Sequence, residues 1–329
     1  MKKINLLLLA SLLSIGVIAG CGSNGNTDNE NAGADSADKE QAENQESAAF
    51  PVTIKDALDN EVTIEEEPEK IVSLIPSNTE IAFELGLGDK IVGVSEFDNY
   101  PPEAAEKEKI GGMEFNVEKI LSLSPDLVLA HGSVMGSATD ALQQIRDAGI
   151  TVLVIEDAKS FEEVYSTIEM IGKATGADEQ AEETIGKMKD DLQAVKDKAA
   201  QVPEEEKKSV FVEVSPSPEI FTSGSNTFMD EMLTLINADN AAAEQEGWVK
   251  MNEEAIIALN PDVILTTYGY YTENAKDLVL SREGWEGVPA IKNEQVYDVH
   301  SDLVTRTGPR LVQGVEELAK AVYPDVFKE

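Results

Sequence analysis

Short apolar runs alternate with longer amphipathic stretches along most of the chain. The runs contain four or five residues, are rich in Val, Ile and Leu, and are separated by stretches long enough to form helices. Continuous apolar strands between helices are typical of parallel sheets covered on both faces, so the pattern predicts an α/β fold. The predicted strands are 71–75, 91–94, 127–130, 152–155, 210–214, 263–266 and 296–299. A short hairpin is predicted ahead of them, with residues 52–54 and 62–64 as its strands.

One segment of the chain occurs twice. Residues 116–129 read Asn-Val-Glu-Lys-Ile-Leu-Ser-Leu-Ser-Pro-Asp-Leu-Val-Leu, and residues 252–265 read Asn-Glu-Glu-Ala-Ile-Ile-Ala-Leu-Asn-Pro-Asp-Val-Ile-Leu. In each copy we expect the Asn to cap a helix and Pro-Asp to precede a strand. The tripeptide Ser-Asn-Thr also occurs twice, and in its first copy Ser77 and Glu80 fit a capping box. The two halves are therefore expected to have similar folds.

Between the two halves, a single apolar stripe predicts a long helix over residues 178–202. Its members recur every three or four residues, as one face of a helix requires. They are Ala181, Ile185, Met188, Leu192, Val195, Ala199 and Val202. Such a helix would extend roughly 37 Å at about 1.5 Å per residue, and Pro203 ends it. We expect it to join an N-terminal lobe, residues 50–177, to a C-terminal lobe, residues 203–329.

The first twenty residues resemble a bacterial lipoprotein signal peptide. Lys2 and Lys3 precede an apolar run that is too short to span a membrane comfortably and that ends in Ile-Ala-Gly before Cys21. Cys21 is the only cysteine, and a lone thiol in an exported protein cannot form an internal disulfide, so we expect it to carry a lipid anchor. Residues 21–49 contain no large apolar side chain and predict a disordered acidic tether. The expected location is the extracytoplasmic face of the cell membrane, in a bacterium with a single membrane.

Composition excludes several classes of function. Asp and Glu outnumber Lys and Arg by 63 to 26, which gives a net charge of −37 and makes nucleic acid an unfavourable partner. The chain has no G-x-S-x-G, H-E-x-x-H or Walker motif, so we expect no catalytic residue and no enzyme. Sites for bare zinc or manganese usually take several His or clustered carboxylates, and two distant His fit such a site poorly. A surface adhesin or structural lipoprotein stays open as an alternative.

Four segments carry a family resemblance. They are Ile-Val-Ser-Leu-Ile-Pro-Ser-Asn-Thr-Glu-Ile-Ala-Phe at 71–83, Val-Gly-Val-Ser-Glu-Phe-Asp-Asn-Tyr-Pro-Pro at 92–102, Phe-Thr-Ser-Gly at 221–224 and Asp-Leu-Val-Thr-Arg at 302–306. With two similar lobes joined by one helix, the chain resembles the class III substrate-binding proteins of ABC importers for cobalamin, ferric siderophores and haem, and most of all the BtuF-like cobalamin-binding proteins. The resemblance covers residues 50–329. It implies two α/β lobes joined by one long rigid helix, a ligand cleft between them and delivery to an ABC permease with its ATPase subunits; we expect a monomer.

The resemblance also implies which residues line the cleft. They are Phe97, Tyr100, Met113, His131, Phe221, Trp248, Asp302 and Arg306. Met113 and His131 stand where cobalamin binders have tryptophans, which leaves the exact ligand open. Tyr268 is added because it follows the strand 263–266, and ligands of parallel sheets bind beyond the carboxyl ends of the strands. We expect the aromatic residues in loops, where a flat macrocycle would cover them.

The expected ligand is a cobalt corrinoid, and the alternatives are a ferric hydroxamate chelate or haem; no resident cofactor or protein-bound metal is expected. Of the four arginines in the chain, only Arg306 matches a binding position of the family. A strongly anionic catecholate chelate would need several cationic side chains, so this count favours a near-neutral corrinoid.

Two acidic residues are candidates for permease docking. Glu118 and Glu254 occupy the same place in the two copies of the repeat. A Glu in the first turn is also stabilised by about 0.3–1 kcal/mol through the helix dipole alone. In the family that the chain resembles, one acidic residue on each lobe engages arginines of the permease, and these two residues match those positions.

Overall fold

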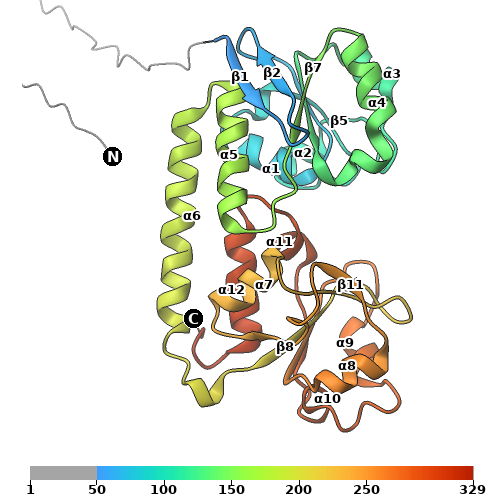
Figure 1. The fold of residues 1–329 in the computed structure, drawn as a ribbon, viewed down its shortest axis with the longest axis vertical. Helices are drawn as coiled ribbons and strands as arrows, with labels where there is room; N and C mark the ends of the chain where they lie inside the picture. Colours follow the sequence, from blue (N-terminus) through green and yellow to red (C-terminus); the bar gives the residue numbers. More distant parts are fainter. Residues whose placement is uncertain (1–49, 329) are drawn as a thin grey trace, which may run out of the picture. The chain divides into compact units, whose positions relative to one another are not determined.

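The computed structural model describes residues 50–328. The predicted signal peptide, Cys21 and the tether 21–49 therefore lie outside the described residues. The chain from Phe50 onward forms two α/β lobes (Figure 1), as the sequence pattern predicts. None of the described helices combines the length and apolar character that a membrane span needs.

The N-terminal lobe contains a five-stranded parallel sheet with the strand order β5-β4-β3-β6-β7. Its strands are β3 (Ile71–Ser73), β4 (Ile91–Val94), β5 (Glu108–Lys109), β6 (Leu127–His131) and β7 (Thr151–Ile155). The predicted hairpin forms a separate antiparallel pair of β1 (Val52–Lys55) and β2 (Glu61–Ile64). The helices of this lobe are α1 (Pro76–Glu84), α2 (Pro102–Ala105), α3 (Val117–Leu123), α4 (Met135–Asp147) and α5 (Phe161–Thr175).

The C-terminal lobe contains a four-stranded parallel sheet with the order β10-β8-β12-β13. Its strands are β8 (Ser209–Glu213), β10 (Asp239–Asn240), β12 (Val263–Thr266) and β13 (Val296–Asp298). Two further strands, β9 (Phe221–Ser223) and β11 (Trp248–Lys250), form an antiparallel pair. The helices are α7 (Phe228–Leu235), α8 (Glu253–Leu259), α9 (Ala275–Leu280), α10 (Pro289–Lys292), α11 (Ser301–Thr305) and α12 (Leu311–Val322).

The two sheets share one topology, since β4-β3-β6-β7 in the first lobe corresponds to β10-β8-β12-β13 in the second. The sequence repeat supplies the same local contacts twice. Asn116 accepts a hydrogen bond from the Lys119 amide at 2.9 Å and caps α3, and Asn252 accepts one from the Ala255 amide at 2.8 Å and caps α8. The Asp of each Pro-Asp pair then accepts from the backbone beside the neighbouring strand. The predicted similarity of the two lobes is confirmed.

The Ser-Asn-Thr motif does not have the same role in its two copies, and the predicted capping box is wrong. Helix α1 begins at Pro76 and has no side-chain cap, so Ser77 lies inside its first turn. Proline is favoured in that first turn because its missing N–H needs no partner there. In the second copy Thr227 itself caps α7 and accepts a hydrogen bond from the Asp230 amide.

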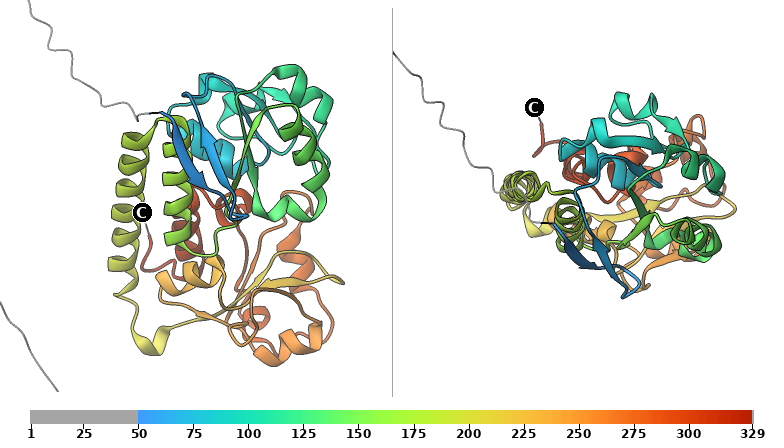
Figure 2. Two further views of the ribbon diagram at one scale, coloured as in Figure 1. Left: turned by 45° about the horizontal axis from the view of Figure 1, so that its top comes forward. Right: turned by 90° about the horizontal axis from the view of Figure 1, so that it is seen from above.

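The long helix α6 (Asp178–Ala199) connects the lobes and buries the predicted apolar stripe. It lies beside α5 and also packs against α7 and α12 (Figures 1 and 2). One apolar cluster runs from β3 and β6 through α6 to β8 and β12. The lobes are thus joined by continuous packed core, and not by the helix backbone alone.

Candidate ligand cleft between the lobes

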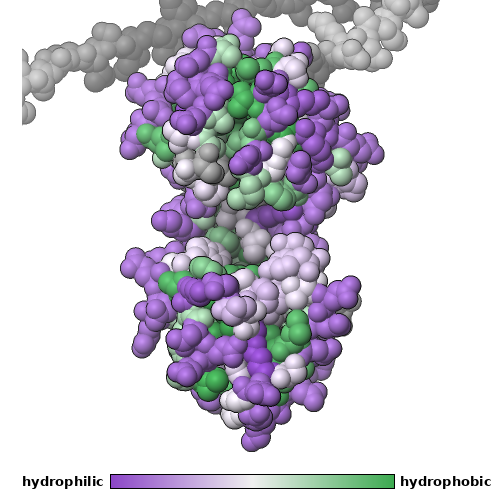
Figure 3. Space-filling model, turned by 90° about the vertical axis from the view of Figure 1, so that its right-hand side faces the viewer, coloured by the Kyte–Doolittle hydropathy of each residue, from purple (hydrophilic) through white to green (hydrophobic). Residues whose placement is uncertain are grey.

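The carboxyl ends of strands from both sheets line a cavity of about 380 Å³ between the lobes. In each sheet the connections run in opposite directions from the first strand, so the switch points lie between β3 and β6 and between β8 and β12. Ligands of open α/β sheets bind at such points. Figure 3 shows the hollow that separates the lobes on one face. The cavity is lined by Ile75, Pro76, Ser77, His131, Ser133, Asp157, Val214, Phe228, Trp248, Thr305, Arg306 and Thr307.

Large apolar side chains are exposed on both lobes. In the N-terminal lobe Phe97 is 51% exposed and Tyr100 is 40% exposed, and in the C-terminal lobe Phe221 and Trp248 are 40% and 45% exposed. Met113 is also exposed. The expectation that all four rings lie in loops is wrong for Phe221 and Trp248, which lie in β9 and β11. Pairing of these strands holds the two rings on a fixed backbone.

Trp248 packs against a residue that the sequence did not single out. Its ring centroid lies 5.6 Å from that of Phe228, the first residue of α7, and both residues line the cavity. Phe228 is buried and begins an apolar helix face, so its sequence pattern is that of an ordinary core residue.

His131 ends β6 and lines the cavity, as expected from its place after an apolar strand. Its Nδ1 accepts a hydrogen bond from the Ser133 amide at 3.2 Å and lies 2.8 Å from Ser133 Oγ. Because Nδ1 accepts, the neutral ring carries its proton on Nε2. Burial lowers the pKa of His131, while the charge of Asp157 acts in the opposite direction. The ring therefore offers an N–H donor and no free lone pair for a metal.

Asp302 and Arg306 belong to an ionic cluster that joins the lobes. The carboxylate of Glu80, in α1, accepts hydrogen bonds from Arg306 Nη1 at 2.7 Å and from Arg310 Nε and Nη2 at 2.8 and 2.7 Å. Arg306 also donates to Asn99 Oδ1 at 2.8 Å and lies 3.0 Å from Asp302. Both terminal nitrogens of Arg306 are thus engaged, and two arginines face two carboxylates.

Arg310 also covers one of the expected cleft residues. Its guanidinium carbon lies 3.8 Å from the ring centroid of Tyr100. One face of this ring is therefore covered by a cation. Only the rest of the Tyr100 ring is left to contact a ligand.

Tyr268 is not a cleft residue, and this prediction is wrong. The side chain is fully buried, and its hydroxyl donates to Glu213 at the end of β8. Arg282 donates to the same carboxylate at 2.7 and 2.6 Å. Burial raises the pKa of Tyr268, and the charge of Glu213 raises it further. Tyr268 points into the lobe after β12 because its hydroxyl is bonded to this buried carboxylate. The next two tyrosines, Tyr270 and Tyr271, are exposed.

Glu118 and Glu254 are both exposed in the first turns of α3 and α8. The adjacent Glu253 has a different environment, because it accepts hydrogen bonds from Ser217 Oγ at 2.7 Å and from Trp285 Nε1. The Ser217 hydrogen bond lowers the pKa of Glu253. Each lobe thus presents one carboxylate at equivalent positions, and their role in docking stays a prediction.

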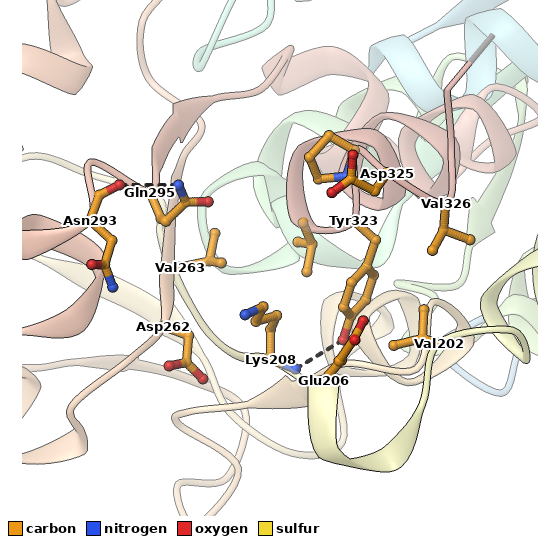
Figure 4. Close-up of a pocket in the computed structure, with 12 residues that line it drawn as sticks. Val202, Glu206, Lys208, Asp262, Val263, Asn293, Gln295, Tyr323, Asp325 and Val326 are labelled. Carbon is orange, nitrogen blue, oxygen red and sulfur yellow. Dashed lines mark hydrogen bonds between the residues drawn. The ribbon is translucent and has the colours of Figure 1, made fainter.

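A cavity of about 430 Å³ lies at the other end of the C-terminal sheet (Figure 4). It is lined by residues beside the amino ends of β8 and β12, among them Lys208, Asp262 and Val263. The hydroxyl of Tyr323 accepts from the Lys208 amide at 3.0 Å and donates to the Asn237 carbonyl at 2.8 Å. This cavity lies at the end of the strands where open α/β sheets do not bind ligands, so the interlobe cavity is the better candidate site. Across residues 50–328, no group of three or more His, Cys, Asp or Glu is arranged to hold a metal ion.

Comparisons with known proteins agree with the fold. A family model described as periplasmic binding protein matches residues 71–303. The chain is 52% identical, over the whole length of both, to a Bacillus subtilis protein named uncharacterized ABC transporter substrate-binding lipoprotein YvrC. It is 30% identical to a cobalamin-binding protein of Halobacterium salinarum, over 86% of this chain and 77% of that one.

Solved structures with the same fold carry different ligand names. A possible iron-binding protein of Staphylococcus epidermidis is 36% identical with a TM-score of 0.71, over 78% of this chain and 100% of that one. The haem-binding protein RhuT of Roseiflexus is 28% identical with a TM-score of 0.71, over 79% and 99%. The vitamin B12-binding protein BtuF of Vibrio cholerae is 28% identical with a TM-score of 0.65, over 80% and 99%. The chain belongs to the periplasmic binding protein family, whose members are the substrate-binding components of ABC transporters.

Proposed function

We propose that this protein captures a bulky, near-neutral metal chelate of the corrinoid class between its lobes and delivers it to an ABC permease. One observation carries the proposal: the half-exposed ring of Trp248 lines a cavity whose arginine is already neutralised by carboxylates, and that arginine also holds the carbonyl of the exposed Phe97 on the other lobe.

The aromatic rings suit a large ligand with apolar surface. Exposed rings on a folded domain leave apolar area in water, and covering that area is favourable by about 25 cal/mol per Å². Because Trp248 lines the cavity and is held by β11, it presents its ring without further ordering. A macrocycle inserted between the lobes would cover such rings from both sides.

The charge of the cleft argues against a strongly anionic ligand. Arg306 and Arg310 are paired with Glu80, Arg306 also with Asp302, and Asp157 adds a further carboxylate to the cavity. An anionic chelate would have to displace one of these pairs or face unpaired carboxylates. A ferric hydroxamate or haem is the second candidate, because the relatives include a haem-binding protein and a possible iron-binding protein.

The first experiment is calorimetric titration of residues 22–329 with cyanocobalamin, with a ferric hydroxamate and haem as comparators. We expect saturable 1:1 binding of the corrinoid, weakened about 30-fold in Trp248→Ala if this ring is a central contact. Leu58→Ala is the matched control, since Leu58 is exposed to 40% in the β1–β2 turn and is not among the residues that line the cavity. If only a comparator binds, the ligand belongs to the class of that comparator. If none of the three compounds binds, the assignment of the cleft is contradicted.

The wider proposal is a lipid-anchored, extracytoplasmic monomer that acts with a permease and its ATPase subunits. The Bacillus subtilis relative is named as a lipoprotein, and Cys21 follows a signal of the matching type. A tether would keep the loaded protein near its permease, which raises the effective concentration of the two partners. Glu118 and Glu254 are the residues that we propose for docking.

A further inference from the structure

The hydroxyl of Ser77 is a buried polar group without a partner. Ser77 is 4% exposed, lines the interlobe cavity, and its Oγ has no hydrogen bond within the described part of the chain. A buried hydroxyl without a partner costs about 1–3 kcal/mol, so most such groups are satisfied. Rotation about one bond moves this hydroxyl among its staggered positions. Its lack of a partner therefore points to a partner that arrives with the ligand.

The same place offers unused backbone donors. Helix α1 has nine residues and begins at Pro76, and Ile75 at its N-cap provides no side-chain acceptor. Proline has no N–H, so the first donors of the helix are the amides of Ser77 and Asn78, which have no carbonyl in a preceding turn. No acidic residue lies in this first turn. In the corresponding helix of the other lobe, α7, Thr227 caps the helix and Asp230 and Glu231 lie in the first turn.

The position of this helix end is held firmly at the switch point. Asn78 Nδ2 donates to the Ala130 carbonyl at 3.0 Å, which ties the start of α1 to the end of β6. Ser77 and His131 consequently line one cavity. The N-terminal lobe thus places two kinds of donor at this cavity. They are the N–H that we assign to His131 Nε2 and the first donors of α1.

We infer that Ser77 Oγ, together with the first-turn amides of α1, forms a subsite for an uncharged hydrogen-bond acceptor, such as an amide carbonyl, on the periphery of the bound chelate. The inference rests on the proposed function and deepens it. A helix N-terminus favours an acceptor oxygen, whether charged or neutral. The carboxylate of Asp157 lines the same cavity and repels an anion, which selects the neutral acceptor.

The test compares Ser77→Ala with Ser73→Ala in the full-length protein in detergent micelles. Ser73 is a matched control, because it is buried three residues before the start of α1, but its hydroxyl donates to the Ile75 carbonyl at 3.2 Å and accepts from Thr79 Oγ1 at 2.8 Å. The probe is cyanocobalamin, whose periphery carries amides. We expect Ser77→Ala to weaken binding about three- to tenfold while its melting temperature stays level or rises. We expect Ser73→Ala to lower the melting temperature and to bind the probe as the wild type does.

A second titration tests the charge of the acceptor. A cyanocobalamin derivative with one peripheral amide hydrolysed to a carboxylate at the contacting position should bind the wild type more weakly than the parent corrinoid. If every such monocarboxylate binds more tightly than the parent, the subsite prefers an anion and the inferred class is wrong.

Three outcomes separate the subsite from the proposed function. Equal affinity of wild type and Ser77→Ala for a chelate that binds would overturn the subsite alone. If the wild type binds ferrioxamine B and not cyanocobalamin, the same two variants are titrated with that hydroxamate, which also carries amide carbonyls, and the same criterion applies. A wild type that binds neither chelate would overturn the proposed function and the ligand class of the subsite with it.

Discussion

At His131, burial and one backbone hydrogen bond determine what the side chain can do. The residue stands at the carboxyl end of β6, and the Ser133 amide selects the tautomer with its proton on Nε2. Protonation of the ring would break this hydrogen bond and place a charge in a buried cavity. A neutral donor suits a chelate that brings acceptor groups, and it makes His131 an unfavourable metal ligand in this rotamer.

The stability of the protein should therefore depend on the protonation of His131. Burial holds the pKa of the folded state below the ordinary value of 6.5. Between that lowered pKa and 6.5 the unfolded chain binds a proton that the folded chain does not, so the free energy of unfolding falls as the pH decreases through this window. His131→Gln should lose this decrease, at about 1.4 kcal/mol for each pKa unit of the shift. Urea denaturation of both proteins between pH 7.5 and 5 measures the difference.

A decrease of equal size in wild type and His131→Gln would show that the carboxylates alone cause the pH dependence. The control variant is His300→Gln, because the His300 side chain lies at an exposed position. We expect this variant to follow the wild type throughout the pH range.

Single residues also show the limit of the sequence. Four large apolar residues outside any core pattern are exposed, as their sequence context predicts: Phe97, Met113, Phe221 and Trp248. Tyr268 has the same sequence signature and is buried, because its partner Glu213 lies on another strand. Whether a residue after a strand turns outward or inward depends on that partner, which no local pattern contains.

At the scale of elements, the repeat makes two matching helix ends. Helices α3 and α8 begin with an Asn cap, carry an exposed Glu in the first turn and end in a left-handed residue, Ser124 or Asn260. Each of these contacts joins residues that are at most four positions apart in the chain. The sequence alone therefore predicted both helices and the strands that follow. The carboxylates of Glu118 and Glu254 are thereby presented on similar supports in the two lobes.

Reversing both charges should block transport and leave capture intact. We expect Glu118→Arg with Glu254→Arg to bind the chelate with wild-type affinity and to lower uptake by about tenfold or more, because like charges would face the arginines that the family resemblance implies on the permease. Glu106→Arg with Glu283→Arg makes the same change in net charge at exposed positions outside the repeat and serves as the control. Uptake of labelled chelate by cells measures the effect, and unchanged uptake in the first double variant would refute docking through these residues.

At the scale of the whole described unit, several contacts join the lobes, among them a hydrogen bond from the Phe161 amide to Glu231 and two larger connections. One is the apolar cluster through α6, and the other is the ionic cluster around Glu80, whose side chain is 2% exposed. A buried carboxylate with two guanidinium partners has few other arrangements of similar energy. We therefore expect limited hinge motion, with small changes at the cleft when a ligand enters.

Removing the Glu80 charge should loosen the junction. Glu80→Gln leaves two arginines, exposed to 12% and 13%, without their shared carboxylate, and we expect a loss of about 3 kcal/mol in the free energy of unfolding. Hydrogen exchange should become faster in residues 97–100, because Arg306 also holds the Phe97 carbonyl and Asn99. Glu84→Gln, an exposed change one turn later in α1, should alter neither quantity. Unchanged exchange in Glu80→Gln would mean that the apolar cluster, and not the ionic cluster, fixes the lobes.

The predicted lipid anchor belongs to the same scale, although Cys21 lies outside the described residues. We expect Cys21→Ala to move the protein from the membrane fraction to the soluble extracytoplasmic fraction, because the variant lacks the thiol to which the lipid would be attached. Fractionation and immunoblotting measure the distribution. Quantitative recovery of Cys21→Ala with the membrane would rule out this residue as the anchor.

The sequence by itself determined the seven apolar strands, the hairpin before them, the similarity of the two lobes and the long connecting helix, but not β5, β10 or the β9–β11 pair. Apolar periodicity, helix caps and turn residues act between neighbours in the chain, so they can be read without the fold. Only the tertiary structure decided that Tyr268 is buried, that Arg306 and Arg310 meet Glu80 across 226 and 230 residues, and that Ser77 lacks a partner in the cleft. These outcomes depend on which side chains from distant parts of the sequence meet in the fold. The free energy of a buried polar group depends on whether those neighbours form hydrogen bonds or ion pairs with it.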